Sequence, residues 1–405
     1  MRALPRAAWA VLAAALALRL AAAACYFRVP LSEGGDDRQY AAIAESVADG
    51  RGFQWKGAPS AYRAPLYPLF LAALRRLGAA TPGDARLVQA FVGGAAVWLA
   101  YQLGAAAAGP AAGLAAMALT AFDPAQVLLP TSLYTECVFG VLVLLAAWAL
   151  ARYRELPSAS RAAAFGAAVG LSALCRSTLL LAPALLLLGA PGAGRGLRHA
   201  LAAAAVALAV LSPWALRNAL TFGRPILSES GVAGPVLYYA SEGRVYAPPR
   251  EDSVEPMRTM YRSLPPAEWD AFALRSAAAN VRARPARYGA SVVRRAWRLW
   301  ADPYLPYLLH DHPALSGALE TGRDWDALSA ACQGAFLVVA LLAALAAAGP
   351  ARPAVWAALA LALYSGVYAL AAVFARFHAP FIPLVYVAAA AGWADRRRRV
   401  AVTPP

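Results

Sequence analysis

The sequence predicts an all-α membrane protein, a polytopic bundle of about ten transmembrane helices with amphipathic surface helices in its outer loops. Its composition is 61% hydrophobic and only 15% charged, whereas roughly a quarter of the residues in soluble domains are charged. Apolar stretches nearly free of charge also recur along the chain. Several approach the roughly 20 residues that a helix needs to cross a bilayer. This recurrence indicates many membrane spans and disfavours a soluble core.

The apolar stretches set the expected order of the spans and the orientation of the chain. The expected spans are residues 7–27, 86–108, 111–129, 134–151, 162–175, 177–190, 199–215, 327–348, 354–373 and 379–393. With an even number of crossings, both termini and the short arginine-rich segments lie on one side. Since positive charge marks cytoplasmic loops, we expect a multi-pass protein of the cell membrane with both termini in the cytoplasm. Residues 1–393 then form one transmembrane domain, and residues 394–405 form a basic cytoplasmic tail.

The first outer loop, residues 28–85, is expected to contain a helix headed by two carboxylates. The apolar residues of "DDRQYAAIAESVADG" follow the i, i+3, i+4, i+7 spacing of a helix, which ends at the Gly50 and Gly52 breakers. Asp36 and Asp37 therefore lie at its N-terminus. A second short helix follows Pro65, too short to cross the membrane with certainty.

A long outer loop, residues 216–326, follows the seventh span. Its stretch "EWDAFALRSAAANVRARPARYGASVVRRAWRLW" has the pattern of an amphipathic helix, broken near Pro285 because proline interrupts helical hydrogen bonding. Trp297 and Trp300 suit a membrane interface. We expect this helix to lie along the outer membrane surface.

The formal net charge of +15 points to membrane lipids and not to nucleic acid as the partner. Most of the arginines lie in short loops, at one terminus and in the long loop, and no zinc-finger, P-loop or RNA-binding motif is present. Anionic headgroups, and a phosphorylated substrate, fit this charge better. The four histidines, His199, His310, His312 and His378, form no recognisable metal-ligand set.

Three acidic residues at predicted outer boundaries need an explanation in so apolar a chain. Asp36 and Asp37 suit a helix N-terminus, where a carboxylate is stabilising, but a pair exceeds what one cap needs. A carboxylate beside the membrane can also act as a general base toward a hydroxyl or amine. Glu136 has no basic residue within twelve positions on either side. An unpaired acid at the hydrocarbon boundary is costly and is either a snorkelling residue or a functional one.

Four arginines occupy predicted outer ends of spans. They are Arg63, which follows Tyr62, and Arg176, Arg217 and Arg376. Singly, each can reach the lipid headgroups as arginines at helix ends commonly do. Together they form a positive rim on the same face as the acids. Such a rim suits a lipid-linked phosphate, which arginine binds through two parallel hydrogen bonds.

The order of these motifs resembles the GT-C superfamily of integral-membrane glycosyltransferases, closest to the family 39 branch that includes the protein O-mannosyltransferases and the aminoarabinose transferase of lipid A. The resemblance rests on an Asp four residues before a Tyr, Asp36 and Tyr40, followed by "AAIAESVADG" and "GRGF". It continues through "AYRAPLYPLFLAAL", "LYTECVFGVLV", "SPWALRNALTFGRP", "RARPARY" and "RFHAPFIPL". These segments run from about residue 10 to residue 393. Their common order makes the resemblance more specific than any one motif.

The resemblance implies a GT-C-like fold and a transfer reaction at the noncytoplasmic face. The sugar, a hexose or pentose, would move with inversion from a polyprenyl-phosphate-linked donor to a lipid, glycan or protein acceptor. Asp36 would be the general base and Glu136 would orient a substrate. Arg63, Arg217 and Arg376 would bind the donor phosphate. Tyr40, Tyr62, Asp37 and Arg176 would support the site. The pattern of this branch requires no cofactor or metal, but more distant relatives use a divalent cation, and the two facing acids, Asp36 and Glu136, leave a divalent cation open for this chain.

A transporter or flippase of lipid-linked sugars is the alternative function. It would share the spans, the basic rim and the carboxylates. Such a protein is expected to show paired broken helices near the bilayer midplane or internal repeats. No convincing repeat is visible in the sequence, and the polar residues fall at one predicted face.

Overall fold

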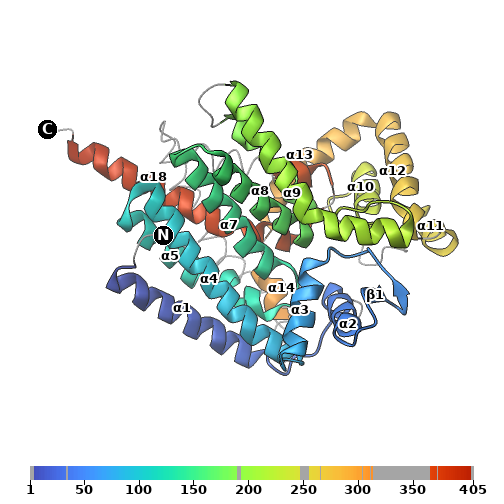
Figure 1. Cartoon of the computed structure of the whole chain (residues 1–405), viewed down its shortest axis with the longest axis horizontal. Coiled ribbons are helices and arrows are strands. Elements are labelled where there is room, and N and C mark those ends of the chain that lie inside the picture. The colour runs from blue at the N-terminus through green and yellow to red at the C-terminus, as the bar shows by residue number, and fades with distance from the viewer. Residues whose placement is uncertain are drawn as a thin grey trace.

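The structure is a computed structural model of the whole chain. It describes residues 4–32, 35–188, 193–246, 255–264, 266–302, 304–310, 312, 365–371 and 373–402. Within these residues, five helices are long and apolar enough to cross a membrane, and a sixth span results if one bent helix pair counts as one. The predicted span 327–348 lies outside the described residues, as does most of the predicted span 354–373. The chain is mainly helical, as the sequence predicts (Figure 1).

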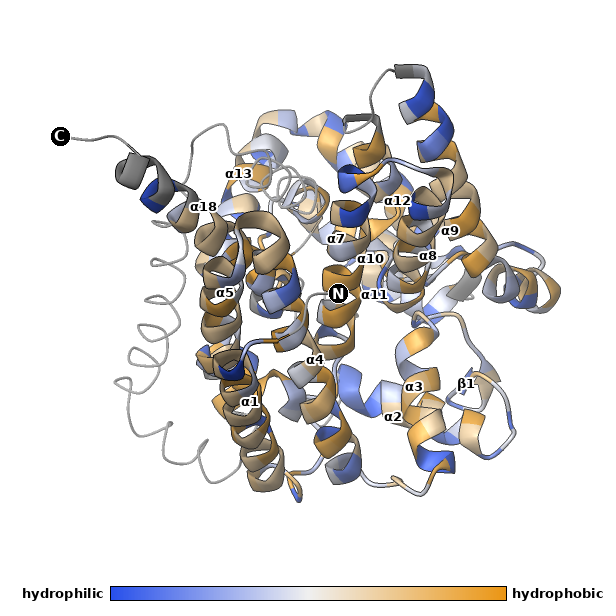
Figure 2. Cartoon of the chain, turned by 60° about the vertical axis from the view of Figure 1, so that its left-hand side comes forward, coloured by the Kyte–Doolittle hydropathy of each residue, from blue (hydrophilic) through white to orange (hydrophobic). Residues whose placement is uncertain are grey.

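Among the described residues, seven helices form the apolar bundle, which Figure 2 shows by the hydrophobic colouring along α1, α4 and α9. They are α1 (Arg6–Cys25), α4 (Pro82–Ala108), α5 (Pro110–Phe122), α7 (Glu136–Glu155), α8 (Ala159–Cys175), α9 (Ala193–Phe222) and α18 (Ile382–Val402). Large apolar side chains such as Trp9, Phe91 and Leu220 are exposed on them. In water this exposure would be unfavourable, but it suits helices that face lipid.

Small residues let the helices of the bundle approach closely. A Cβ atom added at Gly166 of α8 would lie 2.2 Å from the carbonyl oxygen of Ala203 on α9. One added at Gly104 of α4 would lie 2.8 Å from the carbonyl oxygen of Ala112 on α5. Such contacts are typical of helices that associate in membranes, where van der Waals packing replaces the hydrophobic effect between helices.

Two predicted spans have a different form in the structure. The predicted span 111–129 bends by 64°, because α5 ends before Asp123 and Pro124 starts the short α6 (Pro124–Leu128) and η1 (Leu129–Thr131). The predicted span 177–190 consists of two 3-10 helices where it is described, η2 (Ser177–Leu179) and η3 (Ala182–Leu188). The apolar part of the last span ends at Ala394, and its helix α18 continues through the arginine cluster to Val402.

A buried arginine explains how the bend after α5 is tolerated. The side chain of Arg19 on α1 is 1% exposed and donates hydrogen bonds to the carbonyl oxygens of Thr120 and Ala121 at 2.9 and 3.0 Å. These are carbonyls of the last turn of α5, which the helix itself leaves without partners. The arginine that interrupts the first apolar stretch therefore stabilises the break in another span.

The loop after α1 holds four short elements that position the candidate site. They are α2 (Asp36–Ala48), the antiparallel strands β1 (Gln54–Trp55) and β2 (Ala58–Pro59), and α3 (Leu66–Arg76). Helix α2 begins and ends where the sequence predicts and packs against α3. Arg86 of α4 fixes the start of this loop, because it donates to the carbonyl oxygens of Tyr26 and Val29, both at 2.7 Å.

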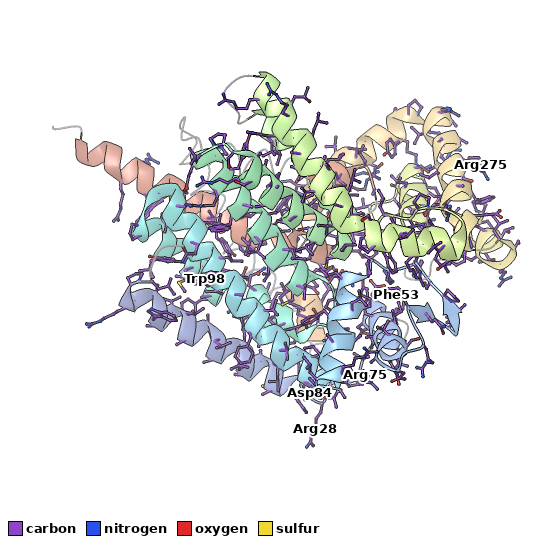
Figure 3. The ribbon with its side chains drawn as sticks, in the orientation of Figure 1. Arg28, Phe53, Arg75, Asp84, Trp98 and Arg275 are labelled. Atoms are coloured by element: carbon purple, nitrogen blue, oxygen red, sulfur yellow. The ribbon has the colours of Figure 1, made fainter. Side chains whose placement is uncertain are left out.

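A second group of helices follows α9. It comprises α10 (Ala233–Ser241), α11 (Met257–Ser263), α12 (Pro266–Ala283), α13 (Pro285–Ala301) and α14 (Leu305–His310), and the 3-10 helix η5 (Ala375–Phe381) leads into α18. The amphipathic stretch is two helices, α12 and α13, separated at the predicted Pro285. Figure 3 shows Arg275 of α12 projecting outward, while Arg28, Arg75 and Asp84 project from the end where α1 finishes and α4 begins.

Candidate active site

One face of α2 is directed at Arg63. Asp36, Gln39 and Tyr40 lie at i, i+3 and i+4, positions that share a face of a helix. The carboxylate of Asp36 forms an ion pair with Arg63, the amide oxygen of Gln39 accepts from Arg63 Nε at 2.9 Å, and the guanidinium lies 5.3 Å from the centre of the Tyr40 ring. The Asp36 to Tyr40 spacing in the motif is therefore the spacing that places both residues against one arginine.

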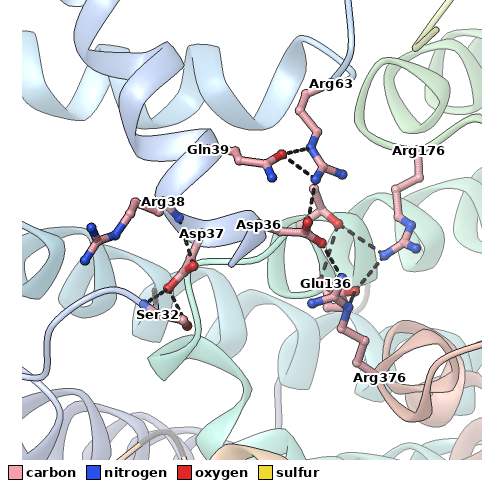
Figure 4. Close-up of polar contacts among 10 residues, drawn as sticks. Ser32, Asp36, Asp37, Arg38, Gln39, Arg63, Glu136, Arg176 and Arg376 are labelled. Atoms are coloured by element: carbon pink, nitrogen blue, oxygen red, sulfur yellow. Dashed lines mark hydrogen bonds and ion pairs between the residues drawn. The ribbon is translucent and has the colours of Figure 1, made fainter. Parts of the chain in front are cut away.

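Asp37 points away from this group. Its carboxylate accepts hydrogen bonds from the backbone N–H and the hydroxyl of Ser32, at 2.8 and 3.0 Å, and the side chain is buried. Gly35 is needed for this fold, since a Cβ atom there would lie 2.4 Å from Asp37 Oδ1. Figure 4 shows the two neighbouring aspartates on opposite sides of the helix start. Asp37 therefore ties the incoming chain to α2.

Glu136 and two further arginines extend the ion-pair network. Arg376 forms an ion pair with Asp36, and its Nε atom lies 3.3 Å from Glu136 Oε1. The same Glu136 oxygen accepts from Arg176 Nη1 at 2.6 Å. The order Arg63, Asp36, Arg376, Glu136, Arg176 thus alternates positive and negative charge (Figure 4). We call these five residues the ion-pair cluster.

The helices bring the cluster to one end of the bundle. Glu136 opens α7 and Arg176 directly follows α8, and since α7 and α8 are joined by a short turn, these two ends lie together. Arg376 lies in η5, which packs against α7 and precedes α18. Asp36 and Arg63 come from the loop between α1 and α4. The cluster is therefore assembled from segments up to 340 residues apart.

Aromatic rings cover the guanidinium groups. Arg376 lies 4.4 Å from the ring centre of Tyr134, Arg176 lies 4.4 Å from that of Phe377, and Arg63 lies 4.8 Å from that of Tyr62. Cation–π contacts of this kind stabilise a partly desolvated cation. They also fix the planes of the guanidiniums, so that the N–H groups are directed toward the carboxylates.

The two carboxylates of the cluster differ in accessibility. The side chain of Asp36 is 25% exposed, whereas that of Glu136 is 1% exposed. Burial alone would raise the pKa of Asp36, but Arg63 and Arg376 outweigh burial and lower the pKa to about 2. Asp36 is therefore ionised at neutral pH and is the carboxylate that an incoming molecule can reach.

The charges of the cluster favour an anion and not a metal cation. Three guanidiniums surround two carboxylates, which leaves one net positive charge. In the part of the chain that the structure describes, no group of three or more His, Cys, Asp and Glu side chains is arranged to hold a metal ion. Because Asp36 and Glu136 each contact two guanidiniums, they are poorly suited as metal ligands.

Arg217, the remaining arginine of the predicted rim, does not join the cluster. It donates to the carbonyl oxygens of Ser60 and Phe53 at 2.8 and 2.9 Å, and so holds the segment that contains β1 and β2. Tyr62 contacts both the cluster and the strand segment. It packs on Arg63 and stacks with Trp55 of β1, with the two ring centres 6.3 Å apart.

Four residues of the site were not predicted from the sequence. Gln39 was detectable, because it lies one helical turn after Asp36. Tyr134 and Phe377 are adjacent to predicted site residues but have no distinguishing pattern. Glu229, in the turn after α9, is close enough to Arg176 and Arg63 to feel their charges, yet nothing around it in the sequence marks it as special.

The chain is similar to a family of known proteins over part of its length. Residues 62–216 match the sequence model of the family described as dolichyl-phosphate-mannose-protein mannosyltransferase, a stretch that includes Arg63, Glu136 and Arg176. No curated protein matches the chain in a sequence comparison.

The fold is similar to that of a solved oligosaccharyltransferase, and further solved structures align over most of the chain with lower TM-scores. The oligosaccharyltransferase of Archaeoglobus fulgidus, in complex with Zn and sulfate, superimposes with a TM-score of 0.52 at 13% identity, over 95% of this chain and 49% of its own. Its complex with an inhibitory peptide and a dolichol-phosphate gives 0.48 at 14% identity, over 96% and 52%. ArnT from Cupriavidus metallidurans, bound to undecaprenyl phosphate, gives 0.46 at 16% identity, over 98% and 79%.

The chain spans about half the length of the archaeal oligosaccharyltransferase. The resemblance that the motifs predict is confirmed, for the chain is similar in sequence over residues 62–216 and in overall fold to membrane glycosyltransferases of the GT-C superfamily.

Proposed function

We propose that the chain is a glycosyltransferase that moves a sugar from a polyprenyl-phosphate-linked donor to a lipid, glycan or protein acceptor, with inversion, at the noncytoplasmic face of the cell membrane. The observation that carries this proposal is an accessible carboxylate, Asp36, held between two guanidiniums at the end of an apolar bundle. The family match over residues 62–216 supports it, since the description of that family names dolichyl-phosphate-mannose, a sugar joined to a polyprenyl phosphate.

Asp36 acts as the general base. Its carboxylate accepts the proton of an acceptor hydroxyl as the hydroxyl oxygen forms a bond to the anomeric carbon of the donor sugar. The bond from that carbon to the phosphate oxygen breaks, and the lipid phosphate leaves with the electron pair. Attack opposite the leaving group inverts the configuration. A positioned base of this kind typically accelerates a reaction by roughly 10²- to 10⁴-fold.

Arg63 and Arg376 bind the donor phosphate and stabilise the charge that develops on it. Preorganised hydrogen-bond donors at a developing charge often contribute more to catalysis than any other effect, and losing one costs about 3 kcal/mol. In the free protein, the carboxylate of Asp36 uses the same guanidiniums. A bound phosphate competes for them, and so releases Asp36 from the pairing that keeps its basicity low.

The net charge of the cluster fits such a donor. A sugar joined to a lipid through one phosphate is a phosphodiester with a single negative charge, which matches the one excess positive charge of the cluster. After transfer, the lipid phosphate gains negative charge, as a phosphate monoester carries about −1.5 to −2 at pH 7. The arginines therefore interact more strongly with the phosphate as its charge grows in the transition state than with the intact donor, which is the condition for catalysis.

The remaining predicted residues support this arrangement. Glu136 orients Arg376 and Arg176, since it is buried and contacts both guanidiniums. Tyr40 and Tyr62 pack on Arg63, and Asp37 anchors α2. Arg217 holds the loop that leads to Arg63 and contacts the donor phosphate only if this loop moves.

We place the cluster and both long loops, residues 28–85 and 216–326, on the noncytoplasmic side, with both termini cytoplasmic and residues 394–405 as the cytoplasmic end. The observation in favour is that Glu136, Arg176 and Arg376 all lie at one end of the bundle. The basic residues around the turn between α7 and α8, such as Arg152 and Arg161, lie at the other end.

Purified full-length protein in lipid nanodiscs tests the function. It is incubated with radiolabelled undecaprenyl-phosphate hexoses and pentoses and with an extract of envelope lipids, glycans and proteins. We expect label to appear on an acceptor and undecaprenyl phosphate to be released. In liposomes, movement of the labelled lipid between leaflets without transfer would instead identify a flippase.

A further inference from the structure

A polar pocket of about 340 Å³ lies beside the ion-pair cluster. Its walls are the turn from Arg224 to Ser230, the residues Ser177 and Leu180 that follow Arg176, and Asp270 of α12. The volume is near the lower end of the roughly 300–1,000 Å³ typical of small-molecule sites. Most of the side chains that line it are charged or hydroxylated. The remaining lining is apolar, from Leu180, Pro225, Ile226 and Leu227, so the pocket suits a small molecule that has both polar groups and an apolar face.

The turn that carries Glu229 is fixed on both sides of that residue. The hydroxyl of Ser228 donates to the carbonyl oxygen of Ala173 at 2.7 Å, and the backbone N–H of Ser230 donates to the carbonyl oxygen of Ala61 at 2.8 Å. Ala173 and Ala61 each precede an arginine of the cluster by a few residues. The backbone at Glu229 is thus held in a defined position relative to the cluster.

Asp270 closes the far side of the same turn. Its carboxylate accepts from the backbone N–H groups of Gly231 and Gly234 at 2.6 and 2.9 Å. The hydrogen-bonding capacity of this acid is therefore used within the protein. Asp270 has a structural role, and Glu229 is the acid of the pocket that is free to bind a ligand.

Glu229 itself has no hydrogen-bond or ion-pair partner among the described residues. Burial raises the pKa of Glu229, and the charges of Arg176 and Arg63 offset this rise only in part. The charges of Arg176 and Arg63 thus lower the pKa of Glu229 although neither guanidinium forms an ion pair with it. Glu229 is half-buried and lines the pocket, so its carboxylate can accept a hydrogen bond from a molecule bound there.

We propose that this pocket binds the ring of a sugar and that Glu229 accepts a hydrogen bond from a ring hydroxyl or amine. The inference rests on the proposed function and assigns the sugar subsite of the same reaction. Glu229 is close enough to Arg176, Arg63 and Asp36 for their charges to affect its carboxyl group, so a sugar in this pocket would lie near the proposed phosphate site. The ring belongs to the donor or to a glycan acceptor, since both carry a sugar with hydroxyl groups. The KM values of the two substrates distinguish these cases.

The test compares Glu229→Gln with Glu268→Gln, which changes an exposed glutamate of α12. Both full-length variants are assayed in nanodiscs with undecaprenyl-phosphate sugars and the acceptor found for the wild type. Removal of the charged acceptor in Glu229→Gln should raise the KM of the sugar-bearing substrate by about tenfold or more. Glu268→Gln should match the wild type. A rise in the KM of the donor, with slower donor hydrolysis in the absence of acceptor, assigns the donor sugar, and a rise confined to the acceptor assigns the acceptor sugar.

Binding of undecaprenyl phosphate without a sugar separates this role from a structural one. Glu229→Gln should leave its Kd unchanged and should not lower the melting temperature, since no described residue forms a hydrogen bond or ion pair with the Glu229 side chain. An unchanged KM for both substrates, an equal loss of affinity for bare undecaprenyl phosphate, or a lower melting temperature would each overturn the inference. Wild-type protein without any transfer activity would instead contradict the proposed function itself.

Discussion

The protein buries arginines in two different ways. Arg19, Arg86 and Arg295 are almost fully buried and donate to backbone carbonyl oxygens of neighbouring segments. The side chains of Arg63 and Arg376, 11% and 21% exposed, are instead paired with Asp36, a carboxylate that is 25% exposed. Backbone carbonyls are fixed in place, so the first group can only hold the fold together. A carboxylate can be replaced by another anion, and the second group is therefore suited to binding a substrate.

The two kinds of arginine should respond differently to substitution: loss of a carbonyl-bonded arginine should lower stability, and loss of a cluster arginine should lower activity. A carbonyl-bonded arginine leaves several buried acceptors without partners when it is removed, at a cost of about 1–3 kcal/mol for each group. Removal of an arginine from the ion-pair cluster leaves each carboxylate with at least one remaining guanidinium. The substitutions below test this contrast, in order of decreasing effect.

Arg376→Gln should have the largest effect on activity. Arg376 is the one residue of the cluster that contacts both Asp36 and Glu136, and we expect it to bind the departing phosphate. Transfer should fall by about a hundredfold or more, while the melting temperature in detergent changes little. A variant with wild-type rates would remove Arg376 from the mechanism.

Arg295→Gln should show the opposite pattern. Arg295 donates to the carbonyl oxygens of Ala369, Ala240 and Arg244 at 2.7–3.1 Å, and so joins α13 to two other segments. We expect a melting temperature lower by several degrees, with kcat retained by the molecules that remain folded. The exposed Arg275→Gln is the matched control. If Arg295→Gln lost activity without losing stability, the contrast between the two kinds of arginine would be wrong.

The pH dependence of transfer should change when the donor binds. Because Arg63 and Arg376 lower the pKa of Asp36 to about 2 in the free protein, Asp36 stays ionised as the pH falls to about 3. Once the donor phosphate pairs with Arg63 and Arg376, these arginines no longer lower the pKa of Asp36, whereas its burial still raises it. The acid limb of kcat, which reports the bound complex, should therefore lie at higher pH than the acid limb of kcat/KM, which reports the free protein. The same profiles are measured in the Glu229→Gln variant, so that titration of Glu229 does not contribute to them. If the acid limbs of kcat and kcat/KM fall at the same pH, the phosphate does not displace Asp36 from the arginines.

Asp37→Asn should have the smallest effect on the reaction. Asp37 accepts hydrogen bonds from Ser32 and has no contact with the cluster. We expect transfer within a few-fold of the wild type and a slightly lower melting temperature. A loss of activity as large as that of Arg376→Gln would show that the two aspartates have been assigned in the wrong order.

Sequence patterns predicted the elements that depend on neighbouring residues. The helix from Asp36, the short helix after Pro65 and the break at Pro285 all follow from local spacing and from proline. The turn between β1 and β2 had a signal that was missed. Lys56 and Gly57 both have positive φ, of 54° and 78°, and a residue followed by glycine is typical of two-residue hairpin turns.

Long-range partners could not be predicted in this way. Glu136 has no basic residue near it in the sequence, yet it is paired with Arg176, 40 residues away, and with Arg376. Which arginines face carboxylates and which face carbonyls depends on how the helices pack. For this reason Arg217, which looks like the other rim arginines in the sequence, lies against the hairpin instead.

Asp36→Asn tests the central claim most directly, when transfer and binding are measured on the same preparation. If Asp36 is the base and also occupies the phosphate-binding arginines, the variant should lose transfer by about 10²-fold or more and bind undecaprenyl phosphate at least as tightly as the wild type. Transfer at the wild-type rate would contradict the account.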